Sequence, residues 1–234
     1  MEKNIARYLA AALAFLAQLT PASAREILPI DTGWRFSRAN VVKAETTDQD
    51  DTSWQQVTLP HTFNAKDGDD GGNDYYRGPA WYRLHVDLTF TEDRRVFIEF
   101  GAATLTADVY VNGRYVGRHE GGFSAFRFDI TNFTKSGSNL IAVRVNNARD
   151  KTVAPIGGDF TVFGGLIRPV RLILTGPIHL DLLDDGGPGV YVTTTKITPT
   201  AAELSVATRI SNDTDVPVSK SLHLFIRNAK GAVV

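Results

Sequence analysis

The chain has no cysteine among its 234 residues, which excludes disulfides. Its charges nearly cancel, because 25 basic residues stand against 26 acidic ones, so nothing points to nucleic acid or an anionic membrane as partner. The five histidines never stand two or four residues apart, which argues against a zinc site. The folded part must therefore be stabilised by core burial alone, which about 150 residues can support.

The N-terminus has the parts of a secretory signal peptide in their usual order. Lys3 and Arg7 supply positive charge, and Tyr8–Leu19 is an apolar run too short for the roughly 20 residues of a bilayer span. Ala22-Ser23-Ala24 then gives a small-x-small cleavage pattern. We expect cleavage near Ala24 and export to the periplasm or the exterior, with a buried N-terminal helix as the alternative. No later segment is apolar enough to span.

Beyond Ala24 the sequence alternates apolar and polar residues, with glycine and proline at short intervals. In Trp81–Phe90 this alternation predicts one apolar face and one mostly polar face. Many short strands of this kind predict an all-β sandwich or barrel. We expect strands at Trp34–Phe36, Gln56–Leu59, Trp81–Phe90, Arg95–Phe100, Ala107–Val111, Arg114–Val116, Ala125–Ile130, Asn139–Asn146, Val170–Leu174 and Ile178–Leu183.

A hairpin is the clearest local prediction. Asn112-Gly113 stands between Ala107–Val111 and Arg114–Val116. Both residues of such a two-residue turn need positive φ, which asparagine and glycine tolerate best.

A second group of strands is expected after the linker-like stretch Leu182–Pro188. The candidates are Gly189–Thr195, Ala202–Asn212 and Leu222–Arg227, with a turn at Asn228–Gly231. An immunoglobulin-type sandwich needs about seven strands. The pattern therefore predicts a fragment of a longer polypeptide or a truncated gene product.

Six segments in order carry a family resemblance. They are Gly33–Phe36, Leu59–His61, Gly78–Arg83, Ala107–Gly117, Asn139–Asn147 and Asp159–Val170. The set resembles the N-terminal part of glycoside hydrolase family 2, which includes β-galactosidases, β-glucuronidases and β-mannosidases. The resemblance implies an all-β chain: a signal peptide at 1–24, a galactose-binding-like jelly-roll β-sandwich at 25–182, and an incomplete immunoglobulin-like sandwich at 186–234.

The family's catalytic barrel has no counterpart in this sequence. Retaining hydrolysis uses two carboxyl groups about 5–5.5 Å apart, and the resemblance places both glutamates on the barrel. Neither the family's Asn-Glu pair nor its Asn-x-Arg-x-x-His-Tyr-Pro signature occurs here. Catalysis by this chain alone is not expected, the barrel is its expected partner, and no cofactor is implied.

Asp159 is the first substrate-binding candidate. In the family's β-galactosidases an aspartate at this position reaches the active site and binds sugar hydroxyls, and charge-assisted hydrogen bonds are roughly twice as strong as neutral ones. The alternative is a loop carboxylate that caps local N–H groups. Arg168, a few residues later, is expected to form a structural ion pair, with a ligand carboxylate as its alternative partner.

The loop Asn64–Pro79 is long for an all-β connection, and such loops are usually functional or disordered. Its acids, glycines and tyrosines are a mixture that suits a carbohydrate site, so Asn73 and Asp74 are further substrate-binding candidates. A solvated acidic loop is the main alternative. A calcium loop beginning Asp67-x-Asp69 lacks the required glutamate at its twelfth position.

The sequence leads to one main functional hypothesis and two alternatives. The main one is the sugar-binding portion of an exported family 2-like glycosidase, with β-galactosidase favoured by the context of Asp159. A stand-alone lectin-like module is the first alternative, because jelly rolls also serve as lectins. An assembly module that uses an open sheet edge is the second.

Overall fold

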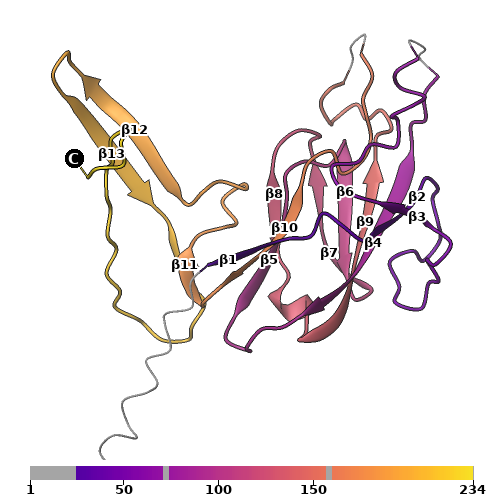
Figure 1. Ribbon diagram of the computed structural model, residues 1–234, viewed down its shortest axis with the longest axis horizontal. Coiled ribbons are helices and arrows are strands. Elements are labelled where there is room, and N and C mark those ends of the chain that lie inside the picture. Colours follow the sequence, from indigo (N-terminus) through magenta and orange to yellow (C-terminus); the bar gives the residue numbers. More distant parts are fainter. Residues whose placement is uncertain (1–24, 71–73, 157–159, 234) are drawn as a thin grey trace, which may run out of the picture.

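The computed structural model describes residues 25–70, 74–156 and 160–233. The predicted signal peptide lies outside these ranges. Within them, no helix is long and apolar enough to cross a membrane. The chain forms a two-sheet sandwich and a smaller group of strands, from which a long hairpin projects (Figure 1).

Both sheets of the sandwich are antiparallel. The smaller sheet has the order β1-β10-β5-β8: β1 (Glu26–Pro29), β10 (Val170–Thr175), β5 (Arg95–Phe100) and β8 (Phe126–Asp129). The larger has the order β3-β2-β4-β9-β6-β7: β3 (Gln55–Val57), β2 (Trp34–Ser37), β4 (Pro79–Leu88), β9 (Gly137–Asn146), β6 (Thr106–Val111) and β7 (Arg114–Glu120). The predicted all-β jelly-roll class is thereby confirmed.

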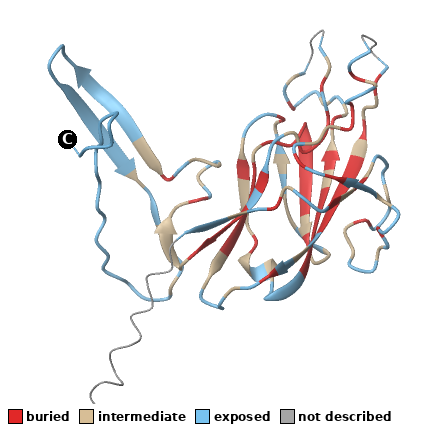
Figure 2. Ribbon diagram, viewed as in Figure 1, coloured by how far each residue is buried: buried red, intermediate tan, exposed pale blue. Residues whose placement is uncertain are grey.

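The core lies between the two sheets because alternate residues of each strand face inward. Tyr82 and Leu84 of β4 meet Ile98 and Phe100 of β5 in one buried cluster. Each large apolar side chain buried in this way contributes roughly 1.5–3 kcal/mol. Buried residues are concentrated in the sandwich, whereas the projecting hairpin is exposed (Figure 2).

The predicted hairpin joins β6 and β7. Asn112 has φ of 52° and Gly113 has φ of 79°, as a two-residue turn of this type requires. The Asn112 side chain also donates to the carbonyl of Phe133 at 2.9 Å and accepts from the Leu140 N–H at 2.9 Å. The turn is therefore fixed both by backbone geometry and by contacts with neighbouring segments.

The polar face expected on Trp81–Phe90 is covered only at its first residues, because His85 and Asp87 are exposed. Residues 38–54 fold over that end and bury Trp81 and Arg83. Arg83 is fully buried, and its Nε donates to Asp51 at 2.7 Å. The pattern was correct, but a polar face can also be covered by a loop that supplies hydrogen bonds.

The second group contains two strand pairs. β11 (Ile178–Leu180) pairs with β14 (Ile210–Asn212), and β12 (Val190–Ile197) pairs with β13 (Ala202–Thr208). The single strand expected at Ala202–Asn212 divides at Arg209, whose N–H bonds to Gly189 and whose carbonyl accepts from Asp181.

Leu222–Arg227 was wrongly expected to be a strand. Its residues are exposed, and an isolated bridge between Arg227 and Val233 is the only pairing found there in the described ranges. An alternating apolar pattern does not make a strand where no neighbouring strand accepts its hydrogen bonds.

Candidate functional site

Two long loops meet at one end of the sandwich: residues 61–78, which lead into β4, and residues 147–169, which follow β9 (Figure 1). Asp74 belongs to the first loop and is exposed. Asn73 and Asp159 lie outside the described residues, so their roles remain predictions. What the structure does describe is how the two loops are joined.

Asn64 joins the loops from a fully buried position. Its Oδ1 accepts from the Gly164 N–H at 2.8 Å and from Nδ2 of Asn147 at 3.1 Å. Its Nδ2 donates to the carbonyl of Tyr76 at 3.0 Å. One side-chain amide therefore satisfies groups on both loops at once.

Asn147 completes the same network, also fully buried. Its Nδ2 donates to the carbonyl of Val162 at 3.0 Å and to that of Tyr76 at 3.2 Å. Its Oδ1 accepts from the Gly78 N–H at 2.9 Å. Buried polar groups are costly when unpaired, so this network holds the loops in one arrangement.

Tyr75 provides another hydrogen bond between the two loops. Its ring is buried, and its hydroxyl accepts from the Val162 N–H at 2.8 Å. Nearby, the Thr161 hydroxyl donates to the carbonyl of Gly68 at 3.0 Å. The first loop is thus bonded to the segment that follows residue 159, so Asp74 and the flank of Asp159 lie on one joined structure.

Gly164 is needed where the loops approach most closely. A Cβ there would lie 2.0 Å from Phe63 Cζ and 2.8 Å from Asn147 Cγ. We expect Gly164→Ala to cost about 2–3 kcal/mol of unfolding free energy through overpacking, measured by urea denaturation. Gly137→Ala is the control: a Cβ there meets nothing within 4 Å, and only the φ of 96° at Gly137 opposes the change, whereas Gly164 has no positive φ. Equal losses in the two variants would contradict the packing argument.

Asp67 stabilises the first loop through hydrogen bonds. Its carboxylate accepts from the Tyr76 N–H at 3.1 Å and from Arg38 at 3.0 Å. Burial alone raises the pKa of Asp67, but the hydrogen bonds from Tyr76 and Asn64 outweigh it and lower the pKa. Within the described residues, no group of three or more histidines, aspartates and glutamates is placed to hold a metal ion.

Within the described ranges, Arg168 has no ion-pair partner, so the expected ion pair stays a prediction. It is exposed, and it donates to the carbonyl of Phe123 at 2.9 Å. Short stretches of sequence do not distinguish a carboxylate partner from a backbone carbonyl, because a guanidinium bonds to both.

Two aromatic residues near the loops have structural roles. His61 Nδ1 lies 2.8 Å from the Tyr82 hydroxyl. Burial lowers the pKa of His61 and raises that of Tyr82. Both rings pack against Phe36 in an aromatic cluster at the base of the first loop.

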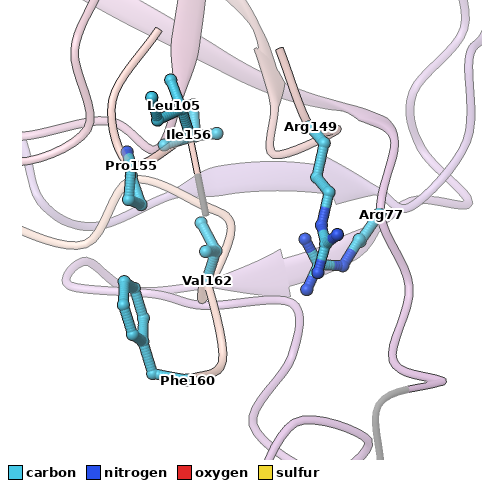
Figure 3. Close-up of a pocket in the computed structure, with 7 residues that line it drawn as sticks. All are labelled: Arg77, Leu105, Arg149, Pro155, Ile156, Phe160 and Val162. Carbon is cyan, nitrogen blue, oxygen red and sulfur yellow. The ribbon is translucent and has the colours of Figure 1, made fainter. Parts of the chain in front are cut away.

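A small pocket opens beside the joined loops (Figure 3). Its lining residues are Arg77, Leu105, Arg149, Pro155, Ile156, Phe160 and Val162. Sequence reasoning did not select either arginine. Arg77 stood in a loop already noticed for its tyrosines, whereas nothing in the sequence around Arg149 marked it.

An antiparallel jelly roll with polar and aromatic loops gathered at one end is an arrangement shared with lectins and other ligand-binding modules. Residues 21–177 match the sugar binding domain of glycosyl hydrolases family 2, and the chain belongs to this family. The resemblance drawn from the six segments is thereby confirmed.

Relatives with different printed activities match the chain. A β-glucuronidase of Bacteroides fragilis is 31% identical over 90% of this chain and 29% of its own length. A β-galactosidase of Thermoanaerobacter pseudethanolicus is 33% identical over 80% of this chain and 25% of its own length. The crystal structure of a Bacteroides uniformis β-glucuronidase superposes with a TM-score of 0.78 and 35% identity, over 82% of this chain and 23% of that one. The chain thus spans less than a third of these relatives.

Proposed function

We propose that this chain is the sugar-binding N-terminal part of an exported β-glycosidase, in which it shapes the substrate pocket and a catalytic barrel performs the hydrolysis. The family match over residues 21–177 supports this role. The pattern of residues 1–24 supports export. The barrel would supply the two carboxyl groups that retaining hydrolysis needs.

The joining of the two loops is the observation that carries the proposal. Asn64 and Asn147 fix the base of each loop against the other. A binding group must be held within about 0.5 Å of its productive position. A loop pair bonded in this way meets that requirement for the loop that contains Asp74 better than two independent loops.

The sugar is best stated as a β-glucuronide or a β-galactoside. Printed names of the relatives include both β-glucuronidases and β-galactosidases. The earlier preference for galactoside rested on the context of Asp159 alone, and the relatives give it no exclusive support. Hydrolysis of both nitrophenyl glycosides by the longest polypeptide that the gene encodes decides between them.

Asp159→Asn in that longest polypeptide tests the proposal. A charged hydrogen bond contributes about 1.5–3 kcal/mol, so kcat/KM should fall by about 10- to 100-fold. Asp150→Asn is the control, because Asp150 accepts from its neighbour Thr152 through both the N–H and the hydroxyl. Unchanged kcat/KM in Asp159→Asn would remove Asp159 from the pocket. A gene product that binds glycosides without hydrolysing them would favour the lectin-like alternative.

A further inference from the structure

The linker, Leu182–Pro188, is packed against the smaller sheet of the sandwich. Its first residue, Leu182, is buried and forms a cluster with Phe97 of β5 and Ile173 of β10. Gly186 has φ of 74°, and a Cβ there would lie 2.5 Å from a carbonyl oxygen of the segment before β8. The linker therefore lies on the outer face of this sheet, whose inner face forms the core.

Three charged residues lie side by side on the same outer face. Glu99 of β5 stands opposite both Arg171 of β10 and Arg127 of β8. Glu99 is buried, and each of its carboxylate oxygens accepts from one arginine: Oε1 from Arg171 at 2.5 Å and Oε2 from Arg127. A buried charge must be paired and hydrogen-bonded, so Glu99 holds the guanidinium of Arg127 in one position.

The same guanidinium bonds to the linker. Nη1 of Arg127 donates to the carbonyl of Leu182 at 3.2 Å and to that of Gly187 at 2.5 Å. The side chain of Arg127 is only 10% exposed, so little water competes for these bonds. Arg127 thus binds the linker near both of its ends, while Glu99 fixes Arg127 to the sheet.

The linker is also bonded to the second group of strands. Asp184 accepts from the hydroxyl of Tyr191 in β12 and from Arg209, which lies between β13 and β14. The Arg209 N–H bonds to Gly189 at 2.9 Å, and its carbonyl accepts from Asp181 at 3.0 Å. A continuous set of hydrogen bonds therefore runs from β8 through the linker to the base of the projecting hairpin (Figure 1).

We propose that Arg127, held by Glu99, makes Leu182–Pro188 a fixed joint that sets the direction in which the second group of strands leaves the sandwich. Segments between domains are usually exposed and flexible, whereas this one has a buried first residue and carbonyls bonded to a buried guanidinium. In a longer polypeptide the joint would set where a catalytic barrel lies relative to the joined loops, a consequence that rests on the proposed function.

The direction can be measured by spin labelling of the 234-residue chain. The chain has no cysteine, so Ser138→Cys on β9 and Ser205→Cys on β13 introduce two unique labelling sites. Both serines are exposed. Electron double resonance then gives the distance between the sandwich and the hairpin. We expect one narrow distance distribution in this background and a broader one when Arg127→Met is added, because the joint becomes a hinge.

Amide hydrogen exchange measures the linker directly. In Arg127→Met, residues 182–190 should exchange about 10- to 100-fold faster, which is the factor for losing one charge-assisted hydrogen bond. The strands β5 and β10 should keep their protection. Arg127→Met/Glu99→Leu is the second variant, because it leaves no buried carboxylate without its partner. It should keep the sheet folded and release the linker in the same way.

Arg171→Gln is the matched control. Arg171 bonds to the same carboxylate as Arg127, but its side chain is 45% exposed. Within the described ranges, no hydrogen bond joins Arg171 to the linker. This variant should therefore keep the narrow distance distribution and the slow exchange of the unaltered chain.

Unchanged distances and exchange in Arg127→Met and in the double variant would overturn the joint, because the packing of Leu182 would then be sufficient. A broad distribution in the unaltered background would overturn it, and so would equal release in Arg171→Gln. Loss of protection in β5 and β10 of the double variant would show that Arg127 supports the sheet and not the joint. No glycoside enters these measurements, so the proposed function fails or stands separately in the Asp159→Asn assay.

Discussion

Asn147→Ala is expected to lower the free energy of unfolding by about 3–5 kcal/mol. The change removes the only hydrogen-bond partners that the described residues give to the Gly78 N–H and the Val162 carbonyl. Each buried group left unpaired costs about 1–3 kcal/mol, and the space left by the amide adds to that. The loss should appear in urea denaturation followed by tryptophan fluorescence, because Trp34 and Trp81 are both buried.

The matched control is Asn132→Ala. Asn132 is exposed, and its recorded contact is through its backbone carbonyl, which accepts from Arg114. Surface substitutions of this kind usually stay within about 0.5 kcal/mol. A stability of Asn147→Ala within about 1 kcal/mol of the unaltered chain would contradict the network's role. Water entering the space and bridging the two groups is the physical route to that result.

Asn147→Ala also tests whether the amide network stabilises the loops alone or the whole fold. Where Asn147→Ala remains folded at low temperature, the loop residues 61–78 should exchange their amide hydrogens faster, whereas β4 and β9 should keep their protection. Local opening reports the stability of individual segments rather than that of the whole fold. This pattern would show that the buried amides hold in place the loop that contains Asp74.

The hairpin and most of the strands could be predicted from sequence because their signals are local. Asn112-Gly113 needs only its own φ values, and Arg95–Phe100 forms over the expected residues. β1 was missed. Glu26–Pro29 is only four residues long and does not alternate clearly, and it forms by pairing with β10, which lies far along the sequence. Pairing over such a separation leaves no trace in a short window of sequence.

The candidate site was predictable in part. The loop Asn64–Pro79 and the Asp159 segment were both selected, and the structure joins the two loops that contain them. The joining residues were not selected, because Asn64 and Asn147 are 83 positions apart and polar. An asparagine is ordinarily read as exposed. Arg77 and Arg149 line one small pocket for the same reason, because the fold brings together segments that no local pattern connects.

The second large loss of stability is predicted for the part of β4 that residues 38–54 cover. Arg83→Met should lower the free energy of unfolding by about 3–5 kcal/mol, because removing one partner of a buried ion pair is strongly destabilising. Asp51 then keeps His85 as a partner at 2.9 Å but loses its guanidinium. Asp51 is 8% exposed at its side chain, and Arg83 is its main donor at 2.7 Å. Arg83 also donates to carbonyls of residues 44–49, which hold the covering loop in place.

Arg209→Met is the control for this substitution. Arg209 pairs with Asp184, but its side chain is 61% exposed. Exposed ion pairs contribute about 0–1 kcal/mol, so this variant should remain near the unaltered chain. Equal losses in the two variants would mean that burial does not determine the effect.

The pH dependence of stability tests whether the Asp51 carboxylate causes the destabilisation of Arg83→Met. Burial alone raises the pKa of Asp51, but hydrogen bonds from Arg83 and His85 outweigh it and lower the pKa in the folded chain. The pKa of Asp51 is lower in the folded chain than its value of about 3.9 in the unfolded chain. The resulting stability is present above about pH 3.9 and is lost as the pH falls through the folded-state pKa. In Arg83→Met the carboxylate loses its main donor and is protonated more readily. The stability gap between the two proteins should therefore narrow between about pH 7 and pH 3, and a constant gap would show that lost packing of the Arg83 side chain, not charge, causes the destabilisation.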